Sequence, residues 1–438
     1  MKNYIVRLCF LGFILFSTIK GYSQDSLYLD FSKLSQLVAS NSRALKLDAI
    51  SEDISKSQTE ILRNKRLPDA TLSIAAGYLS NVGVIGLKLM DDGFYPMPHF
   101  SNSYRIEANY IVYNGGKINR EIDISALQQK ISSLQTEKDA QGLKLLLSGY
   151  LLDLYTLRLQ RKVYEKNIIQ AESVLQKIKN QLKAGIALKS DQIRNELLVE
   201  EMKLQLLRVK NGISILNNVL VETLNLPQHS QIVPTNISFI EEPTIALDIW
   251  QQKALQDAPD LQIKAIEGDI FKKEKQQTKS NILPRLSLYL ENGLSRPYVY
   301  DIPAKDIYSN ILSTGIRLNY SLDELYKNKE KVHQADNHLE YAHEKEELAK
   351  EELRKSLFTA HTLYVEAQQA LASEEKKTEL ATENYRRITN SYYQQVALIT
   401  DLTDASNQKL TAELQMVAAR SKIVMRYLEL KKTAGLLK

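Results

Sequence analysis

The chain has 438 residues, and its 57 lysines and arginines nearly balance 52 aspartates and glutamates, for a formal net charge of +5. A charge this close to balance does not indicate nucleic-acid binding. The single cysteine, Cys9, lies in an N-terminal segment whose cleavage would leave a mature chain without thiols. We therefore expect no structural disulfide, zinc-thiolate site or thiol nucleophile. The low counts of glycine (16) and proline (10) favour long helices.

The N-terminus has the layout of a Sec-type secretory signal peptide. Lys2 and Arg7 precede an apolar stretch at 8–16, and small residues follow at 21–23. This order predicts cleavage after residue 23. The apolar stretch is too short for a permanent membrane anchor. The residues before Cys9 do not resemble a lipoprotein cleavage box, so we expect no lipidation.

Two longer segments, 103–112 and 312–322, alternate apolar and polar residues, and two shorter segments, 71–78 and 286–290, do the same. A period of two predicts strands with one apolar and one polar face. A half-buried sheet of a soluble protein is one interpretation. The length of the strands, their strongly polar second face and the aromatic residues near their ends favour a membrane β-barrel instead. The polar face would then line the lumen, with Arg105, Glu107, Asn109, Arg317 and Asn319.

The segment from about 117 to 183 has no proline and one glycine, which predicts a single helix of about 65 residues, roughly 100 Å long. Beyond it, apolar residues follow heptad spacing over 199–220, and a second series follows it over 410–428, with Ser421 as the one polar break. Such spacing predicts packed partner helices.

The chain reads as two copies of one pattern, because 106–191 aligns with 316–401 at a constant offset of 210 residues. Each copy is expected to contain a helix, two strands, a very long helix, a tight turn and a further helix. We therefore expect a signal peptide at 1–23, a first repeat at 24–226, a proline-containing linker or small extra element at 227–245, and a second repeat at 246–438.

Three local patterns resemble the TolC-like outer membrane factor family, also called outer membrane efflux proteins. The run at 110–117 is similar to the family's passage from strand to long helix, although Tyr110 stands where proline is usual. The turns at 184–191 and 394–401 are similar to the family's hairpin tips, although Gln395 replaces the glycine found at Gly185. The resemblance covers essentially the whole mature chain.

The resemblance implies a mixed, mainly α fold, in which each protomer of a homotrimer gives four strands to one twelve-stranded transmembrane β-barrel. The helices would form a long periplasmic α-helical barrel. The function implied is an outer-membrane exit duct of a tripartite efflux pump or type I secretion system, in outer-membrane lipid. A periplasmic adaptor and an inner-membrane transporter would be its partners. Four strands cannot close a barrel alone, which independently requires oligomerisation if they span the membrane.

The resemblance also assigns sites. Asp401 and Asp404 would line the periplasmic aperture, and the two tips would dock the adaptor. For Asp401 the alternative is an acid at a helix start, favoured by the helix dipole, and for Asp191 we expect such capping. The expected docking residues are Gly185, Ile186, Ala187, Leu188, Ser190, Val396, Ala397, Leu398 and Thr400.

The sequence contains no recognisable catalytic constellation, so we expect neither an enzyme nor a cofactor. His333, His338 and His343 are spaced five apart, which winds them around a helix, and we expect no metal site there. Two other functions stay open: a periplasmic coiled-coil scaffold, and an adaptor protein without its own pore. The first does not explain the two-faced strands, and the second does not explain a duplicated hairpin.

Overall fold

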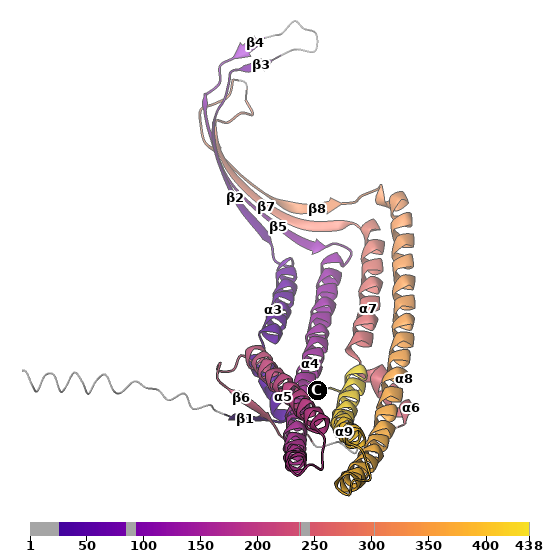
Figure 1. The fold of residues 1–438 in the computed structure, drawn as a ribbon. Coiled ribbons are helices and arrows are strands. Elements are labelled where there is room, and N and C mark those ends of the chain that lie inside the picture. The colour runs from indigo at the N-terminus through magenta and orange to yellow at the C-terminus, as the bar shows by residue number, and fades with distance from the viewer. Residues whose placement is uncertain (1–25, 85–92, 236, 238–245, 302, 438) are drawn as a thin grey trace, which may run out of the picture. The chain divides into compact units, whose positions relative to one another are not determined.

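The structure is a computed structural model that describes residues 26–84, 93–235, 237, 246–301 and 303–437. The expected signal peptide and Cys9 lie outside the described residues. From α2 onward, and apart from the short elements β3, β4, β6 and η1, the order helix, helix, strand, strand, long helix, helix occurs in both halves of the chain (Figure 1). The elements are β1 (Ser26–Leu29), α2 (Phe31–Asn41), α3 (Arg43–Asn64), β2 (Asp69–Tyr78), β3 (Val82–Val84), β4 (Gly93–Tyr95), β5 (Phe100–Tyr113), α4 (Lys117–Lys183), α5 (Lys189–Thr223), β6 (Gln231–Pro234), α6 (Leu247–Asp257), α7 (Pro259–Lys279), the short 3-10 helix η1 (Ser280–Ile282), β7 (Arg285–Arg296), β8 (Ser309–Asn319), α8 (Glu324–Tyr393) and α9 (Ile399–Thr433).

These elements form two compact units. The first, here called the helical unit, comprises Met1–Lys46, Lys138–Ala258 and Glu352–Lys438. The second, here called the sheet unit, comprises Leu47–Glu137 and Pro259–Glu351. Each unit therefore draws on both halves of the chain.

The sheet unit holds an antiparallel four-stranded sheet in the order β2-β5-β7-β8. The alternating segments of the sequence form these strands, as predicted. The period of two ends early in β5, because a register shift between Ile111 and Tyr113 leaves Val112 without a cross-strand partner in β7. The last strand was predicted too far along the chain: β8 ends at Asn319, before Tyr320.

The passage from β5 into α4 requires glycine. Gly115 and Gly116 have φ angles of +66° and +78°, in the left-handed region that side chains disfavour. A Cβ atom on Gly115 would also lie 3.1 Å from the Cβ of Ser280 and 3.0 Å from the Leu283 side chain. Within the run 110–117, the backbone at Gly115 therefore lies too close to η1 and to Leu283 to leave room for a side chain.

The sheet unit also contains the antiparallel pair β3-β4 and helices held by polar contacts. Thr59 of α3 and Ser125 of α4 pair through their hydroxyls at 2.9 Å in a buried position. Lys273 of α7 forms an ion pair with Asp123 of α4 at 2.9 Å. Such contacts place α3 and α7 on the part of α4 nearest the sheet.

The helical unit contains the C-terminal parts of α4 and α8, together with α5 and α9. The single 67-residue helix predicted from 117 to 183 is confirmed as α4, and α5 and α9 each have 35 residues. Of the predicted α5 seam, the structure fully buries Val199, Met202 and Leu220. The largest core cluster contains Leu29, Leu34, Val38, Leu147, Leu151, Leu154, Leu220, Val221, Leu224 and Ile232.

The proline-containing stretch between the halves includes a small extra element, one of the two possibilities left open for it. Its strand β6 pairs in parallel with β1, and Ser26 lies opposite Gln231. Asn217 of α5 supports β6 with both ends of its amide. Its Oδ1 accepts the Ile232 backbone N–H at 2.8 Å, and its Nδ2 donates to the Ser230 carbonyl at 3.0 Å.

Candidate functional site: strand faces and hairpin tips

One face of the sheet carries the five residues expected to line a lumen. On β5, Arg105, Glu107 and Asn109 alternate with apolar residues, and on β8 Arg317 and Asn319 do so. The register of the strands places all five on one face of the sheet. The sequence therefore predicted their common side correctly.

Arg105 separates two carboxylates on this polar face. Glu107 of β5 lies directly opposite Glu291 of β7, and like charges in such a pair destabilise a sheet. The Arg105 guanidinium lies 3.4 Å from an oxygen of each, with Nη1 toward Glu107 and Nε toward Glu291. All three side chains are substantially exposed, so the group forms a wet charged cluster rather than a buried one.

Arg317 is held by an aromatic ring. Its guanidinium carbon lies 4.8 Å from the ring centre of Tyr289 on β7. The ring lies over Gly315, where an added Cβ would come within 2.8 Å of the tyrosine hydroxyl. Gly315 thus leaves space for Tyr289 to lie along the polar face toward Arg317, in the geometry of a cation–π contact.

The opposite face of the sheet is apolar and exposed. The leucines and isoleucines that β2, β5 and β8 place on it are each at least 53% exposed, and Leu288, Leu290 and Leu294 of β7 are 37–44% exposed. Such exposure is unusual for a contiguous apolar surface in water. Both edge strands, β2 and β8, have no further strand beside them among the described residues. Its most exposed leucines and isoleucines are Leu72, Ile74, Ile106, Leu312, Ile316 and Leu318.

The two helical hairpins of the helical unit end in turns of the same geometry. Gly185 has a φ angle of +74°, and the Ile186 N–H donates to the Gln181 carbonyl at 2.9 Å. In the second turn Gln395 has a φ angle of +63°, and the Val396 N–H donates to the Ser391 carbonyl at 2.9 Å. The second turn therefore forms although glutamine occupies the left-handed position.

The turns present matched aliphatic side chains to solvent. Ile186 and Leu188 are 56% and 68% exposed at the first tip, and Val396 and Leu398 are 79% and 70% exposed at the second. Gly185, Ser190 and Thr400 are also exposed, whereas Ala187 and Ala397 pack partly against a core cluster. A cavity of about 390 Å³ separates the two tips and is lined by both.

Aspartates, not serine, cap the helices after the turns. At the start of α5 the Leu188 N–H donates to the Asp191 carboxylate at 3.2 Å. The expected capping role of Asp191 is thus confirmed. In the same way the Leu398 N–H donates to the Asp401 carboxylate at 3.0 Å, so Asp401 is an acid at a helix start. Asp404 lies one turn further along α9 and is exposed.

Tyr392 lies between the tips and is 8% exposed. Burial raises the pKa of its phenol, and the nearby charge of Asp191 raises that pKa further. The hydroxyl therefore stays protonated as a hydrogen-bond donor near the carboxylate of the other tip.

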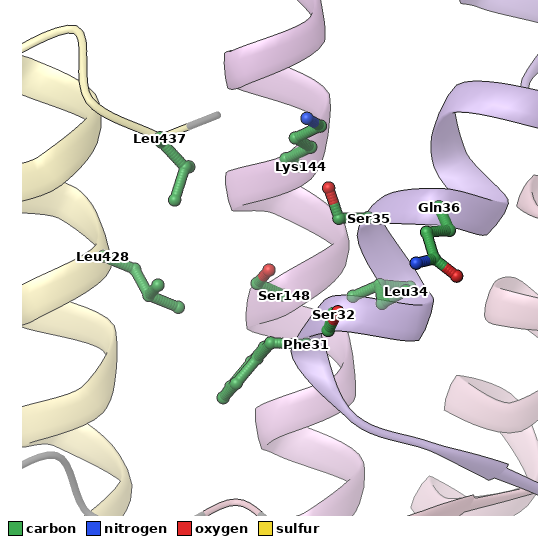
Figure 2. A pocket seen from close by; sticks show the side chains of 9 residues that line it. All are labelled: Phe31, Ser32, Leu34, Ser35, Gln36, Lys144, Ser148, Leu428 and Leu437. Carbon is green, nitrogen blue, oxygen red and sulfur yellow. The ribbon is translucent and has the colours of Figure 1, made fainter.

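A second cavity of the helical unit, of about 400 Å³, lies between α2, α4 and the end of the chain (Figure 2). Its apolar wall comes from Phe31, Leu34, Leu428 and Leu437, and Figure 2 shows Phe31 projecting between the helices. Its polar rim comes from Ser32, Ser35, Gln36, Lys144 and Ser148.

The described residues contain no group of three histidine, cysteine, aspartate or glutamate side chains that could hold a metal ion. His338 stacks on Phe271, with ring centres 5.7 Å apart. Among the residues that the structure describes, no helix combines the length and the apolar character needed to cross a bilayer.

Residues 250–436 match the family model described as outer membrane efflux protein. The second half of this chain is an outer membrane efflux protein domain. The family resemblance found in the sequence is thereby confirmed. The matched copy has Leu325 and Tyr326 where the first copy has Gly115 and Gly116. No curated protein matches the chain.

Solved structures are similar to this chain over nearly its whole length, including the part before the outer membrane efflux protein domain. CusC matches with a TM-score of 0.78 at 12% identity, covering 96% of each chain. VceC of Vibrio cholerae matches with a TM-score of 0.77 at 12% identity, covering 92% of this chain and 96% of that one. The CmeC outer membrane channel of Campylobacter jejuni matches with a TM-score of 0.76 at 13% identity, covering 95% and 90%. The predicted protomer fold is therefore confirmed.

Proposed function

We propose that this chain is the protomer of an outer-membrane channel with a long periplasmic extension. The observation that carries the proposal is a four-stranded sheet with one exposed apolar face, one polar face and two open edges. Hydrocarbon suits the first face and a water-filled lumen the second. Open edges are not tolerated in lipid, so they must pair with other copies. Export would follow from a Sec-type signal peptide at 1–23, without lipidation.

The assembly proposed is a homotrimer with a twelve-stranded barrel. Exposed apolar side chains on α3 support it, because they form a helical stripe that a monomer leaves in water. Their exposed fractions lie between 55% and 68%, well above those of a seam packed within the protomer. A second copy would cover the stripe. Its members are Leu47, Ile50, Ile54 and Ile61.

The channel would serve as the exit duct of a tripartite efflux pump or a type I secretion system. Its partners would be an inner-membrane transporter and a periplasmic adaptor. The matched exposed aliphatic residues of the two tips favour adaptor docking, because paired apolar groups at corresponding positions suit a repeated partner surface. Ile186, Leu188, Val396 and Leu398 would be the main contacts, while Gly185, Ala187, Ser190, Ala397 and Thr400 shape the turns.

Asp401 and Asp404 would line the periplasmic aperture. In a trimer each aspartate forms a ring, and acidic rings bias a pore toward cations. The capping contact of Asp401 is compatible with this role, since the carboxylate accepts one hydrogen bond and its residue remains exposed. Arg105, Glu107, Asn109, Arg317 and Asn319 would line the barrel lumen in the same trimer.

The domain organisation proposed is a signal peptide at 1–23, repeats at 24–226 and 246–438, and an intervening element at 227–245. The repeated element order and the identical lengths of α5 and α9 support it. No catalytic role or cofactor is proposed.

Planar-bilayer recording on purified protein tests the channel, with crosslinking of native membranes as the test of assembly. We expect a three-chain species in the outer-membrane fraction and cation-selective conductance that rises when the tips are opened. A monomer in the soluble periplasmic fraction would contradict the proposal and favour a coiled-coil scaffold. A trimer without conductance in the presence of transporter and adaptor would favour a non-pore role.

A further inference from the structure

Charged side chains are buried inside the helical unit, about two helical turns along α9 from Asp401. Lys409 is 2% exposed and Glu413 is 8% exposed, and both face Asn167 of α4, which is 3% exposed. Lysine and glutamate are rarely buried so fully, and they remain so only when paired. They lie on the buried face of α9, which also carries the apolar residues Leu402, Ala405 and Val417.

The Lys409 ammonium is surrounded by groups from two other helices. Its Nζ donates to Gln170 Oε1 at 2.5 Å and to Asn167 Oδ1 at 3.3 Å, both on α4. The same atom lies 4.9 Å from the ring centre of Tyr385 on α8. Burial lowers the pKa of Lys409, and the charge of Glu413 acts in the opposite direction. The ammonium is therefore costly to bury and depends on this particular set of partners.

Glu413 is satisfied in the same place. Its Oε2 accepts a hydrogen bond from Asn167 Nδ2 at 2.6 Å, and its Oε1 accepts one from Lys166 at 3.1 Å. Lys409 lies 3.9 Å from Glu413 Oε1. Asn167 thus accepts from the cation with one end of its amide and donates to the anion with the other. The arrangement works at only one alignment of α9 along α4.

On the tip side of the cluster, the corresponding positions of α4 are apolar. One heptad toward the tip from Asn167 and Ala171 stand Val174 and Ile178, which are 6% and 0% exposed in an apolar cluster. A slip of α9 by one heptad, about 10 Å, would place Lys409 and its partner among them. A polar group at a single seam position is known to fix the register of packed helices in this way, at a cost in stability.

We propose that Lys409, Glu413 and Asn167 form a register lock, which fixes the α8–α9 hairpin at one height along α4. The lock fixes the alignment of α9, in the second repeat, along α4, in the first repeat. Apolar contacts alone would not select one alignment. The lock's consequence for transport rests on the proposed function: the lock would set where Asp401 and Asp404 stand at the aperture. Lys409 and Glu413 are positioning residues and do not line the pore, because they are buried.

Engineered disulfides can report the register, because the only cysteine of the chain, Cys9, lies in the expected signal peptide. The hydroxyl oxygens of Thr156 on α4 and Ser421 on α9 lie 2.5 Å apart. The pair Thr156→Cys with Ser421→Cys therefore reports the native alignment. The pair Val163→Cys with Ser421→Cys reports a slip of one heptad toward the tip. Mild oxidation of trimers followed by denaturing electrophoresis measures both disulfides.

The test variant replaces Asn167, Lys409 and Glu413 by leucine, which keeps an apolar seam and removes the lock. We expect the ratio of slipped to native disulfide to rise at least about tenfold, together with a higher conductance of the closed mouth. A control that replaces Lys203 and Glu172 by leucine removes an exposed interhelical ion pair of 3.1 Å. This control should leave the ratio unchanged.

Two single substitutions keep the outcome decisive. Lys409→Met preserves the length of the side chain without its charge and should raise the ratio by a smaller factor, whereas Lys409→Arg should keep the native disulfide. An unchanged ratio in the leucine and methionine variants overturns the lock. So does loss of the folded trimer in Lys409→Met, because the cluster would then be needed for folding and not for register. A changed ratio in a protein that never conducts supports the lock and contradicts the channel.

Discussion

Replacing Ile316 by arginine tests which face of the sheet meets lipid. Ile316 lies in the middle of β8, opposite Leu288, and its side chain is 68% exposed. If this face lies in hydrocarbon, the substitution buries a guanidinium at bilayer depth in every protomer. On the polar face of the same strand, Ser313 lies opposite Glu291, and Ser313→Arg would add a positive charge beside that carboxylate.

The expected magnitude separates the two variants. An arginine on the lipid face near the midplane costs about 2–4 kcal/mol per chain. Since 1.4 kcal/mol corresponds to a factor of ten, Ile316→Arg should lower the folded-to-unfolded ratio by roughly 30- to 700-fold per protomer. A closed trimer carries three copies of the change. Ser313→Arg should cost less than about 1 kcal/mol, because its charge stays in water near an opposite charge.

The assay is the amount of heat-modifiable trimer in outer membranes, measured by electrophoresis with and without boiling. Urea titration of the protein refolded into lipid vesicles then gives the free energy of folding. We expect near-complete loss of trimer for Ile316→Arg and near-normal amounts for Ser313→Arg. Equal loss in the two variants, or greater loss for Ser313→Arg, would refute the assignment of the faces.

Three further substitutions probe the helical surfaces. Ile54→Glu should reduce trimer formation by removing about 1.5–3 kcal/mol of apolar burial per protomer, whereas Lys56→Glu on the same helix should not, as gel filtration in detergent would show. Gly185→Trp should leave the trimer in the membrane and abolish export, measured as efflux or secretion by whole cells; export at the normal rate would exclude the first tip as a docking surface. Asp401→Asn, which keeps a cap acceptor, and Asp404→Asn should each weaken cation selectivity in planar bilayers while leaving thermal stability within about 0.5 kcal/mol; unchanged selectivity in both would remove the aperture role.

The elements with strong local signals could be predicted from the sequence. The bounds of α4 follow from a long stretch without proline, and the faces of the strands follow from their alternation. The glycines at 115 and 185 were recognisable because the runs around them resemble the family's turns, and the structure places both in left-handed backbone positions. The second tip shows the limit of that signal, since Gln395 adopts the same conformation without being a residue that favours it.

Features that depend on the pairing of distant segments could not be predicted. The short strands β1 and β6 stabilise each other across about 200 residues and have no periodicity of their own. The predicted seam of α9 passed through Leu410 and Leu414, but the structure leaves both half-buried and buries Lys409 and Glu413 instead. Only the partners on α4 make that burial favourable. The shift at Val112 likewise depends on the strand β7 that pairs with it.

The even number of strands has a consequence for closure. Because β2, β5, β7 and β8 are all antiparallel to their neighbours, the two edge strands run in opposite directions. Identical copies arranged around an axis can therefore join β8 of one to β2 of the next as an ordinary antiparallel pair, whereas an odd number of strands would force a parallel seam. Within the chain, β5 and β7 join the hairpin of one half to that of the other. A ring of three chains would thus contain six hairpins. Three junctions between hairpins, each of β5 with β7, would lie within a chain, and the other three, each of β8 with β2, would lie between chains.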